Sequence, residues 1–502
     1  MADIPPMPPI LDEPPRPAAR RRPHGTWAGI GISLGFGAVL DAALDGPPGL
    51  GFLLVASAAA AGLIALTKPR AAALPFFGAG LVLMAFVVVR ASSVVVALDT
   101  LGALCLFSAG ASFAREGWPA ASTVRGYLAR TVAVIGGLPH GFAALTPPIV
   151  GRGGGTVLRR IPTVVVICVP VVGVLAILLG TADPVFGHLL TAQVQRVDVV
   201  SLPVHVFEIG VGAVAFAALA ARARRPVTLG PLETTIDLGP TSAGGTWVPL
   251  LICVDLLFAA FVAVQFAYFF GGRTRVLTQQ GLTFAQYART GFWQLVAAAM
   301  ITGGVIAFAW MAGGREHSRL AAFRWLAGAL VILDLVVLAS AFRRLTLYED
   351  TFGWTWRRLA VHATILAVGA LLLCALAAVI RGRVTWLPTA AVAVAVVTLI
   401  GFSAVNPDAF IAERNLERFQ HTGDLDVWEL RNLSADAAPV LARALPTLDP
   451  CARAQVSALF AETAADTGRV GWASWNLGRE RAADAVAALD EPGPLAVPAG
   501  CV

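Results

Sequence analysis

Charged residues, and lysine above all, are scarce in this chain. Only 14% of its 502 residues are charged, against about 25% in ordinary soluble domains, while 57% are hydrophobic. The mean hydropathy is +0.74. This deficit of charge excludes a soluble globular protein. Lys68 is the one lysine, so the net charge of +6 comes almost wholly from arginine, and the richness in Ala, Gly, Val and Pro indicates a GC-rich bacterial genome.

Standard catalytic motifs are also missing. The sequence contains no HExxH, GxSxG, CxxC or Walker element, and its seven histidines are scattered. The glycines at 151–155 lack the lysine and Ser/Thr of a phosphate loop, so we expect a linker there. We therefore expect no enzyme activity, no cofactor and no metal site. Arginines beside apolar segments serve membrane topology, so no nucleic-acid partner is expected.

Apolar runs of about 20 residues recur along the chain, and this is the length that crosses a bilayer as a helix. The ten-residue alternation of a membrane barrel is absent, so these runs are predicted to be helices. We count about eleven spans, with ten to twelve possible. The runs lie near residues 27–44, 50–66, 74–89, 94–113, 162–179, 202–221, 248–270, 292–311, 320–342, 359–380 and 387–402. The predicted fold is an all-α, polytopic transmembrane bundle.

The segments that flank and interrupt the spans differ in character. Residues 1–25 are rich in proline and arginine, lack the apolar core of a signal peptide and are expected to form a disordered arm. The transmembrane domain is predicted at 26–403, with an amphipathic surface helix and loop near 115–160. Residues 404–490 are charged and predict a small soluble helical domain. Residues 491–502 are expected to be a loose tail.

The arginines predict the orientation of the chain in the plasma membrane. With the N-terminus in the cytoplasm, the early inner loops are basic and the early outer loops are poor in arginine. Eleven spans then place the C-terminal domain outside the cytoplasm, where Cys451 and Cys501 could pair. The loop with Arg273, Arg275 and Arg289 fits this topology poorly. A further span between 115 and 160 would invert everything after it.

Polar side chains inside apolar runs are costly and often functional. His205 and Glu208 lie three residues apart and share a helix face, but two ligands are too few for a metal site. These polar residues form either a proton or cation relay or the interhelical hydrogen bonds that fix a bundle. The candidate relay residues are Asp99, His205, Glu208, Asp255, Gln265 and Asp334.

The stretch 343–359, RRLTLYEDTFGWTWRRL, is the densest polar and aromatic segment between two spans. We expect a loop at the headgroup level, where Trp and Tyr settle and arginines reach phosphates. Such a loop is either an anchor belt or a binding site for an anion or a protein partner.

Three motifs resemble, in order, elements of a bacterial membrane family group. The segment 281–295 is similar to an "LTYAEYAR-x-GF" element, and 344–358 to an "RL-x-x-Y…YGLT-x-x-R" element. Segments 406–418 and 423–441 are similar to a closing "N-D-x-x-IA-x-x-N…LD-x-x-YL-x-x-LS-x-DA" element. The group comprises the domains of unknown function four-one-seven-three and four-one-five-three. The likeness spans roughly 160–490 and implies a membrane architecture but no activity.

Two departures from the family pattern stand out. Trp354 replaces the leucine of GLT, and Gln286 replaces an acid that could pair with Arg289. The favoured function is a non-enzymatic envelope protein that senses, scaffolds or binds a membrane or envelope partner or lipid, in contact with the bilayer. The alternative is an ion-coupled transporter that uses the intramembrane acids. The candidate partner or lipid surface comprises Tyr287, Arg289, Arg344, Tyr348, Gly353, Thr355 and Arg358.

Overall fold

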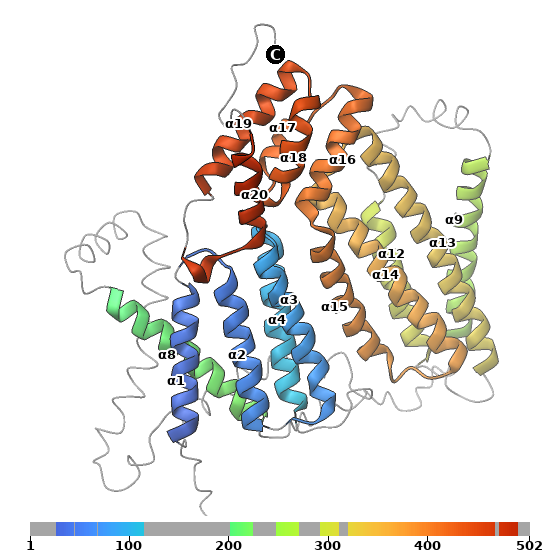
Figure 1. Ribbon diagram of the computed structural model, residues 1–502. Helices are drawn as coiled ribbons and strands as arrows, with labels where there is room; N and C mark the ends of the chain where they lie inside the picture. The colour runs from blue at the N-terminus through green and yellow to red at the C-terminus, as the bar shows by residue number, and fades with distance from the viewer. Residues whose placement is uncertain are drawn as a thin grey trace, which may run out of the picture.

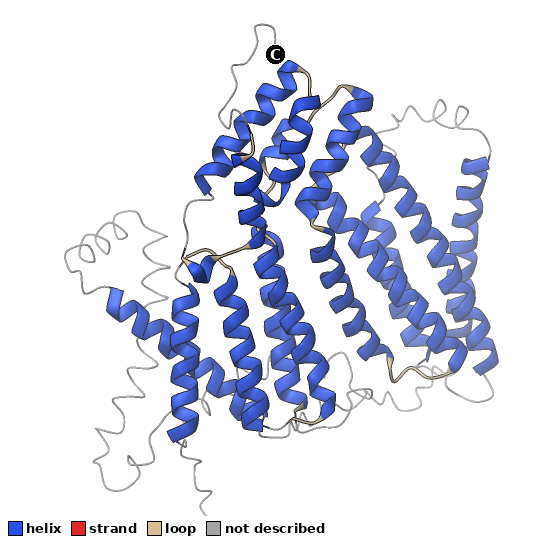
Figure 2. Ribbon diagram, in the orientation of Figure 1, coloured by secondary structure: helices blue, strands red, loops and turns tan. Residues whose placement is uncertain are grey.

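The described part of the chain is entirely helical. The computed structural model describes residues 27–44, 46–67, 69–114, 201–223, 247–270, 292–310, 320–466 and 471–489. Within these ranges it has 15 α-helices and no strand (Figure 2). The bundle helices are α1 (Trp27–Leu44), α2 (Leu50–Thr67), α3 (Leu74–Val89), α4 (Ser93–Phe113), α8 (Ser201–Ala223), α9 (Trp247–Phe270), α12 (Phe292–Ala309), α13 (Leu320–Phe352), α14 (Trp356–Arg381) and α15 (Leu387–Val405).

Among the described residues, five segments are long and apolar enough to cross a membrane, as expected of a multi-pass membrane protein. They are Ala71–Val89, Ser93–Phe113, Leu320–Phe352, Trp356–Arg381 and Leu387–Val405. Each predicted run within the described ranges coincides with a bundle helix. The predicted run at 162–179 and the surface helix near 115–160 lie outside the described residues, as do the arm and the tail.

The bundle helices form two lobes with separate hydrophobic cores (Figure 1). In the first lobe, α1–α4 and α8 pack around a core that includes Phe77 and Phe216. In the second lobe, α9, α12, α13 and α14 pack around Trp247 and Phe323. Helix α15 lies between the lobes, and its Leu399 packs against the first core. The seam between the lobes therefore runs along α15.

A C-terminal helical unit covers one end of the bundle (Figure 1). It comprises α16 (Pro407–Thr422), α17 (Val427–Arg431), α18 (Ala438–Ala444), α19 (Pro450–Asp466) and α20 (Leu477–Ala487). These helices share a core of their own, which includes Val456 and Phe460. The backbone N–H of Leu50 donates to the carbonyl of Trp475, so the α1–α2 turn lies at the covered end. The start of α1 is consequently at the opposite end of the bundle.

The stretch 343–359 is not the loop that the sequence suggested. Helix α13 continues to Phe352, ten residues beyond the predicted end of the span at 342. Its last turns stay helical because Leu345 and Glu349, one turn apart, are buried. The turn is only Gly353, Trp354 and Thr355. The prediction was wrong because a drop in hydropathy marks where apolar residues stop, and a helix packed against protein has no need to end there.

Candidate functional site

The turn between α13 and α14 has a backbone that glycine makes possible. Gly353 adopts φ +76°, a left-handed conformation, and its N–H donates to the carbonyl of Glu349 at 2.8 Å. Thr355 then caps α14, and its side chain accepts from the N–H of Arg358 at 3.5 Å. The chain therefore reverses within three residues and exposes the backbone of Trp354 to the C-terminal unit.

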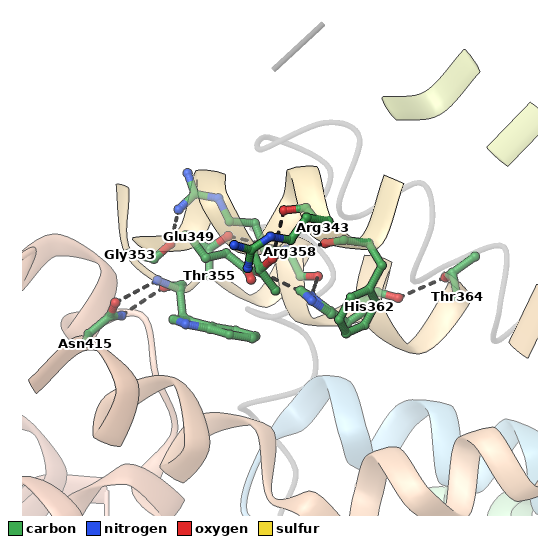
Figure 3. Close-up of polar contacts among 12 residues, drawn as sticks. Arg343, Glu349, Gly353, Thr355, Arg358, His362, Thr364 and Asn415 are labelled. Atoms are coloured by element: carbon green, nitrogen blue, oxygen red, sulfur yellow. Dashed lines mark hydrogen bonds and ion pairs between the residues drawn. The ribbon is translucent and has the colours of Figure 1, made fainter. Parts of the chain in front are cut away.

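Asn415 of α16 clamps this exposed backbone (Figure 3). The N–H of Trp354 donates to Asn415 Oδ1 at 2.7 Å, and Asn415 Nδ2 donates to the carbonyl of Trp354 at 2.9 Å. The Asn415 side chain is buried and satisfies both backbone groups of one residue. A Cβ added at Gly353 would lie 2.6 Å from Asn415 Oδ1. The clamp therefore requires both the amide and the glycine.

Two buried acids of the C-terminal unit extend the contact with the turn. Trp356 Nε1 donates to Asp408 Oδ1 at 2.6 Å, and Ser434 Oγ donates to Asp408 Oδ2 at 2.7 Å. The N–H of Trp356 also donates to Glu429 Oε1 at 3.4 Å. Burial raises the pKa of Glu429 above its usual value. We call the turn Gly353–Trp356 together with Asp408, Asn415 and Glu429 the α13–α14 joint.

Two arginine side chains donate to backbone carbonyls next to this joint. Arg358 donates to the carbonyl of Phe352 at 3.0 Å and to the carbonyl of Gly353, and its guanidinium lies 4.3 Å from the centroid of the Tyr348 ring. Arg418 of α16 donates to the carbonyl of Thr351 at 2.9 Å. The carbonyls at the end of α13 are thus paired by cationic donors.

A buried acid and a histidine lie behind the turn. His362 Nδ1 is 3.2 Å from Glu349 Oε1, and Glu349 is only 1% exposed. The imidazole stacks on Trp354, with ring centroids 5.2 Å apart, and meets the edge of Phe342 at 4.7 Å. His362 Nε2 has no hydrogen-bond partner among the described residues. The sequence analysis missed this pair because its members lie on different helices and match no motif spacing.

A second attachment holds the C-terminal unit to the α3–α4 turn. Asp436 Oδ2 accepts from the N–H groups of Ala91 at 2.8 Å and Ser92 at 3.3 Å. Asn476 Nδ2 donates to the carbonyls of Val87 at 2.9 Å and Arg90 at 2.8 Å. The free N–H groups at the start of α4 and the free carbonyls at the end of α3 are thereby satisfied.

Arg90 links this turn to the end of α15. Its Nε donates to the carbonyl of Ser403 at 2.7 Å, and its Nη2 donates to the carbonyl of Ala404 at 2.8 Å. Ser403 Oγ in turn donates to Asp99 Oδ1 of α4 at 2.8 Å. Arg90, Ser403 and Asp99 are all buried. One network therefore joins α3, α4 and α15.

The third attachment is at the α1–α2 turn. Arg479 Nη2 donates to the carbonyl of Pro48 at 3.0 Å, and the Trp475 carbonyl receives the N–H of Leu50 at 2.9 Å. Gly49 packs directly on the backbone of Ser474 and Trp475, where an added Cβ would collide with main-chain atoms. The C-terminal unit thus contacts three turns, two in the first lobe and one in the second.

The intramembrane acids are divided between the two lobes. Asp99 belongs to the first lobe and bonds Ser403, whereas Asp334 is buried in the second lobe, where Thr302 of α12 faces it. Asp255 lies on α9, and neither of its carboxylate oxygens has a partner in the part of the chain that the structure describes. Within the same residues no group of three or more His, Cys, Asp or Glu is placed to hold a metal ion.

The other candidate residues divide between the joint and the undescribed segments. Tyr348, Gly353, Thr355 and Arg358 come together at the joint, and Arg344 lies on the same last turns of α13. The remaining candidates have side chains or whole residues outside the described part, namely His205, Glu208, Gln265, Tyr287 and Arg289. A role for the described candidates in binding an external partner stays a prediction.

Most of the chain matches the model of one protein family. The family model of the domain of unknown function DUF4153 matches residues 77–444, so the chain belongs to this family. The match confirms one of the two resembling families, and it begins well before residue 160, where the likeness was expected to start. It includes Asp408, Asn415, Glu429 and Asp436 but ends before Asn476. Neither a curated protein nor a solved structure matches the chain.

Replacement of Gly353 by alanine is expected to destabilise the joint. The left-handed backbone costs an alanine about 1–2 kcal/mol, and the new Cβ would also press on Asn415 Oδ1. Thermal unfolding of the purified variant in nanodiscs should show a clearly lower melting temperature than that of the wild-type protein. Gly401→Ala is the matched control, since a Cβ there meets nothing within 4 Å. Equal melting temperatures for the two variants would contradict the clamp.

Asp436 should make stability depend on pH. Burial, only partly offset by the bonds from Ala91 and Ser92, raises the pKa of Asp436 from 3.8 to about 6. At a pH between 3.8 and about 6, the Asp436 carboxyl is protonated in the folded protein and ionised in the unfolded chain. The contribution of Asp436 to the free energy of unfolding therefore falls as the pH rises from 3.8 to about 6.

Melting temperatures at pH 5 and pH 7 test this expectation. The variant Asp436→Asn should lose this component of the pH dependence, whereas Asp484→Asn, an exposed position on α20, should keep it. A pH dependence that is the same in wild type and in Asp436→Asn would show that the carboxyl does not titrate in this range.

Proposed function

We propose that this protein is a non-enzymatic envelope protein that presents its C-terminal helical unit as a binding surface for another envelope protein. The observation that carries the proposal is the attachment of this unit to three turns drawn from both lobes. An attachment of this kind fixes the unit relative to the spans, and a surface that is already ordered binds with less loss of entropy. The same attachments make the unit responsive to the relative position of the lobes.

The proposed topology has eleven spans, a cytoplasmic N-terminus and an extracytoplasmic C-terminal unit in the plasma membrane. The separation of the start of α1 from the C-terminal unit at opposite ends of the bundle supports an odd number of spans (Figure 1). Cys451 is disulfide-bonded, and disulfides persist in oxidising compartments outside the cytoplasm. Both observations favour the same placement.

A membrane-impermeant maleimide tests this topology on intact cells. Cys451 should be labelled only after treatment with a reductant, because its thiol is engaged and the unit faces outward. Cys253, on the apolar helix α9, is the control residue within the bundle. Labelling of Cys451 only after lysis would place the unit in the cytoplasm and overturn the topology.

Charge and aromatic exposure indicate what kind of partner the unit binds. Residues 404–490 contain 13 acidic residues and eight arginines, although the whole chain is basic. Trp428 is 73% exposed, and the exposed acids Asp424 and Asp426 precede it. An acidic surface is repelled by anionic headgroups and attracts cationic side chains, which also stack on tryptophan. A basic protein segment therefore suits this surface better than an anionic lipid.

Site-specific photocrosslinking in cells tests the docking surface. A photoreactive phenylalanine at position 428 should give one discrete protein adduct, whose partner segment is basic. The yield should fall severalfold with Asp424→Asn and at high ionic strength. The same probe at Trp325, which is 82% exposed on α13, should not give that adduct. An adduct that is insensitive to Asp424→Asn and to salt, or no adduct at all, would reject the surface.

Asp255 supports a second candidate function, ion-coupled transport. The Asp255 carboxylate has no partner among the residues that the structure describes, and such a group inside an apolar helix is costly and marks a functional site by default. Asp99 lies in the other lobe from Asp255 and Asp334, which gives this alternative less support, since a coupled carrier gathers such groups around one cavity. If Asp255→Asn leaves every measured proton and cation flux in proteoliposomes unchanged, the alternative has no remaining basis.

A further inference from the structure

A groove opens along the seam between the lobes. It lies between α14 and α15 and has a volume of about 560 Å³. Its walls are apolar and include the small residues Ala363 and Ala370 on α14 and Ala393 and Gly401 on α15. Two lining residues carry polar side chains, His362 and Thr398. Small residues on both facing helices explain why the helices leave a space.

Helix α15 leaves this side of the seam unfilled because its packing is one-sided. Leu399 and Ile400 pack against the core of the first lobe. Val397, which lines the groove, remains 68% exposed, and Leu366 on the opposite wall is also exposed. In a membrane protein such apolar walls are open to lipid.

The groove has one polar end. His362 lies near the start of α14, close to the C-terminal unit, together with Phe402 and Val405 near the end of α15. Ala370 and Ala393 line the part that lies deeper in the spans. The polar end is therefore at the level where headgroups begin, and the apolar part extends toward the middle of the membrane.

His362 brings an unpaired nitrogen to this end. The residue is 7% exposed, and its Nδ1 lies 3.2 Å from Glu349 Oε1 and 3.3 Å from the backbone carbonyl oxygen of Arg358. Its Nε2 is buried without a hydrogen-bond partner in the described residues. Buried polar atoms in proteins are nearly always paired, so an unpaired nitrogen at the end of an open groove indicates a missing ligand group.

We propose that the groove between α14 and α15 binds an uncharged, single-chain lipid whose hydroxyl headgroup pairs with His362 Nε2. A hydroxyl both donates and accepts, so it pairs with this nitrogen whether or not the nitrogen carries a proton. A carboxylate or phosphate headgroup would meet the buried carboxylate of Glu349 close behind the imidazole. The acyl chain of the lipid lies along the groove, beside the alanine and glycine residues that line it. This site is separate from the docking surface at Trp428.

Photolabelling of the full chain in phosphatidylcholine nanodiscs tests the proposal. The probe is a monoacylglycerol with a diazirine in its chain. Unlabelled monoacylglycerol should compete about fivefold better than its dimethyl ether, in which both hydroxyls are blocked, or the fatty acid of equal chain length. The labelled peptides should come from α14 and α15.

Two variants locate the site. Gly401→Leu should reduce labelling at least tenfold, since an added Cβ there meets nothing within 4 Å and the side chain can enter the groove. Gly328→Leu on α13, where a Cβ is equally unobstructed, is the matched control and should label like wild type. His362→Phe keeps a ring against Trp354 and should abolish the preference for the hydroxyl.

Several results would overturn this assignment. Equal labelling of Gly401→Leu and Gly328→Leu would show that the probe reports bulk lipid. Equal competition by the monoacylglycerol and its dimethyl ether would remove the role of His362 Nε2. The comparison of ligands on the wild-type protein stays decisive if His362→Phe fails to fold. Crosslinking at position 428 reports on the docking surface separately, so failure of one proposal is distinguishable from failure of the other.

Discussion

Replacing Arg90 by methionine is expected to lower the free energy of unfolding by about 3–5 kcal/mol. The buried guanidinium donates to the carbonyls of Ser403 and Ala404, and methionine would fill part of the space while supplying neither of these donors. Asp99 would also lose a nearby positive charge. Because the network joins α3, α4 and α15, we expect the seam between the lobes to loosen.

Unfolding in mixed micelles or by thermal denaturation measures this effect. Arg90→Lys should recover part of the loss, since lysine keeps the charge but lacks the planar fork that reaches both carbonyls. Arg381→Met is the control, because Arg381 is an exposed arginine in the last turn of α14. A loss for Arg90→Met no larger than that for Arg381→Met would mean that the network contributes nothing to stability.

Replacing Asn415 by leucine is expected to cost about 2–4 kcal/mol. Leucine has nearly the same shape as asparagine, so the main change is that the N–H and the carbonyl of Trp354 lose their partners in a buried place. The C-terminal unit would then still contact the second lobe through Asp408, Glu429 and Arg418 and through the ring of Phe410 on Trp354. The unit should therefore open locally before the bundle unfolds.

Melting temperature and native-state proteolysis of the C-terminal unit together check this prediction. Asn432→Leu is the matched control, since the exposed Asn432 amide donates only to the carbonyl of Trp428 in its own helix. We expect faster cleavage near α16 in Asn415→Leu and unchanged cleavage in Asn432→Leu. Identical cleavage rates would show that the α13–α14 joint does not hold the unit in place.

Hydropathy located the bundle helices of the described part, because burial in lipid imposes a length on every crossing helix. It misjudged 343–359, where ten residues, eight of them polar or aromatic, extend α13 under the C-terminal unit. Asn415 and Asp408 were within a quoted family motif, but the motif did not indicate which residues they contact. Glu349 and His362 carried no sequence signal at all, since their pairing depends on the turn that places α14 beside α13.

By itself the sequence determined a helical membrane protein of a particular family, with a charged C-terminal segment of different composition. Helix propensity, span length and motif order are local properties, and local properties can be read along a chain. Only the tertiary structure decided that the C-terminal unit holds three turns, that Asp99 bonds Ser403, and that a groove ends at His362. The decisive contacts, such as that of Arg90 with Ser403, join residues 313 positions apart. Hydrogen bonds over such separations leave no periodic pattern in a sequence, because their geometry depends on how the helices pack.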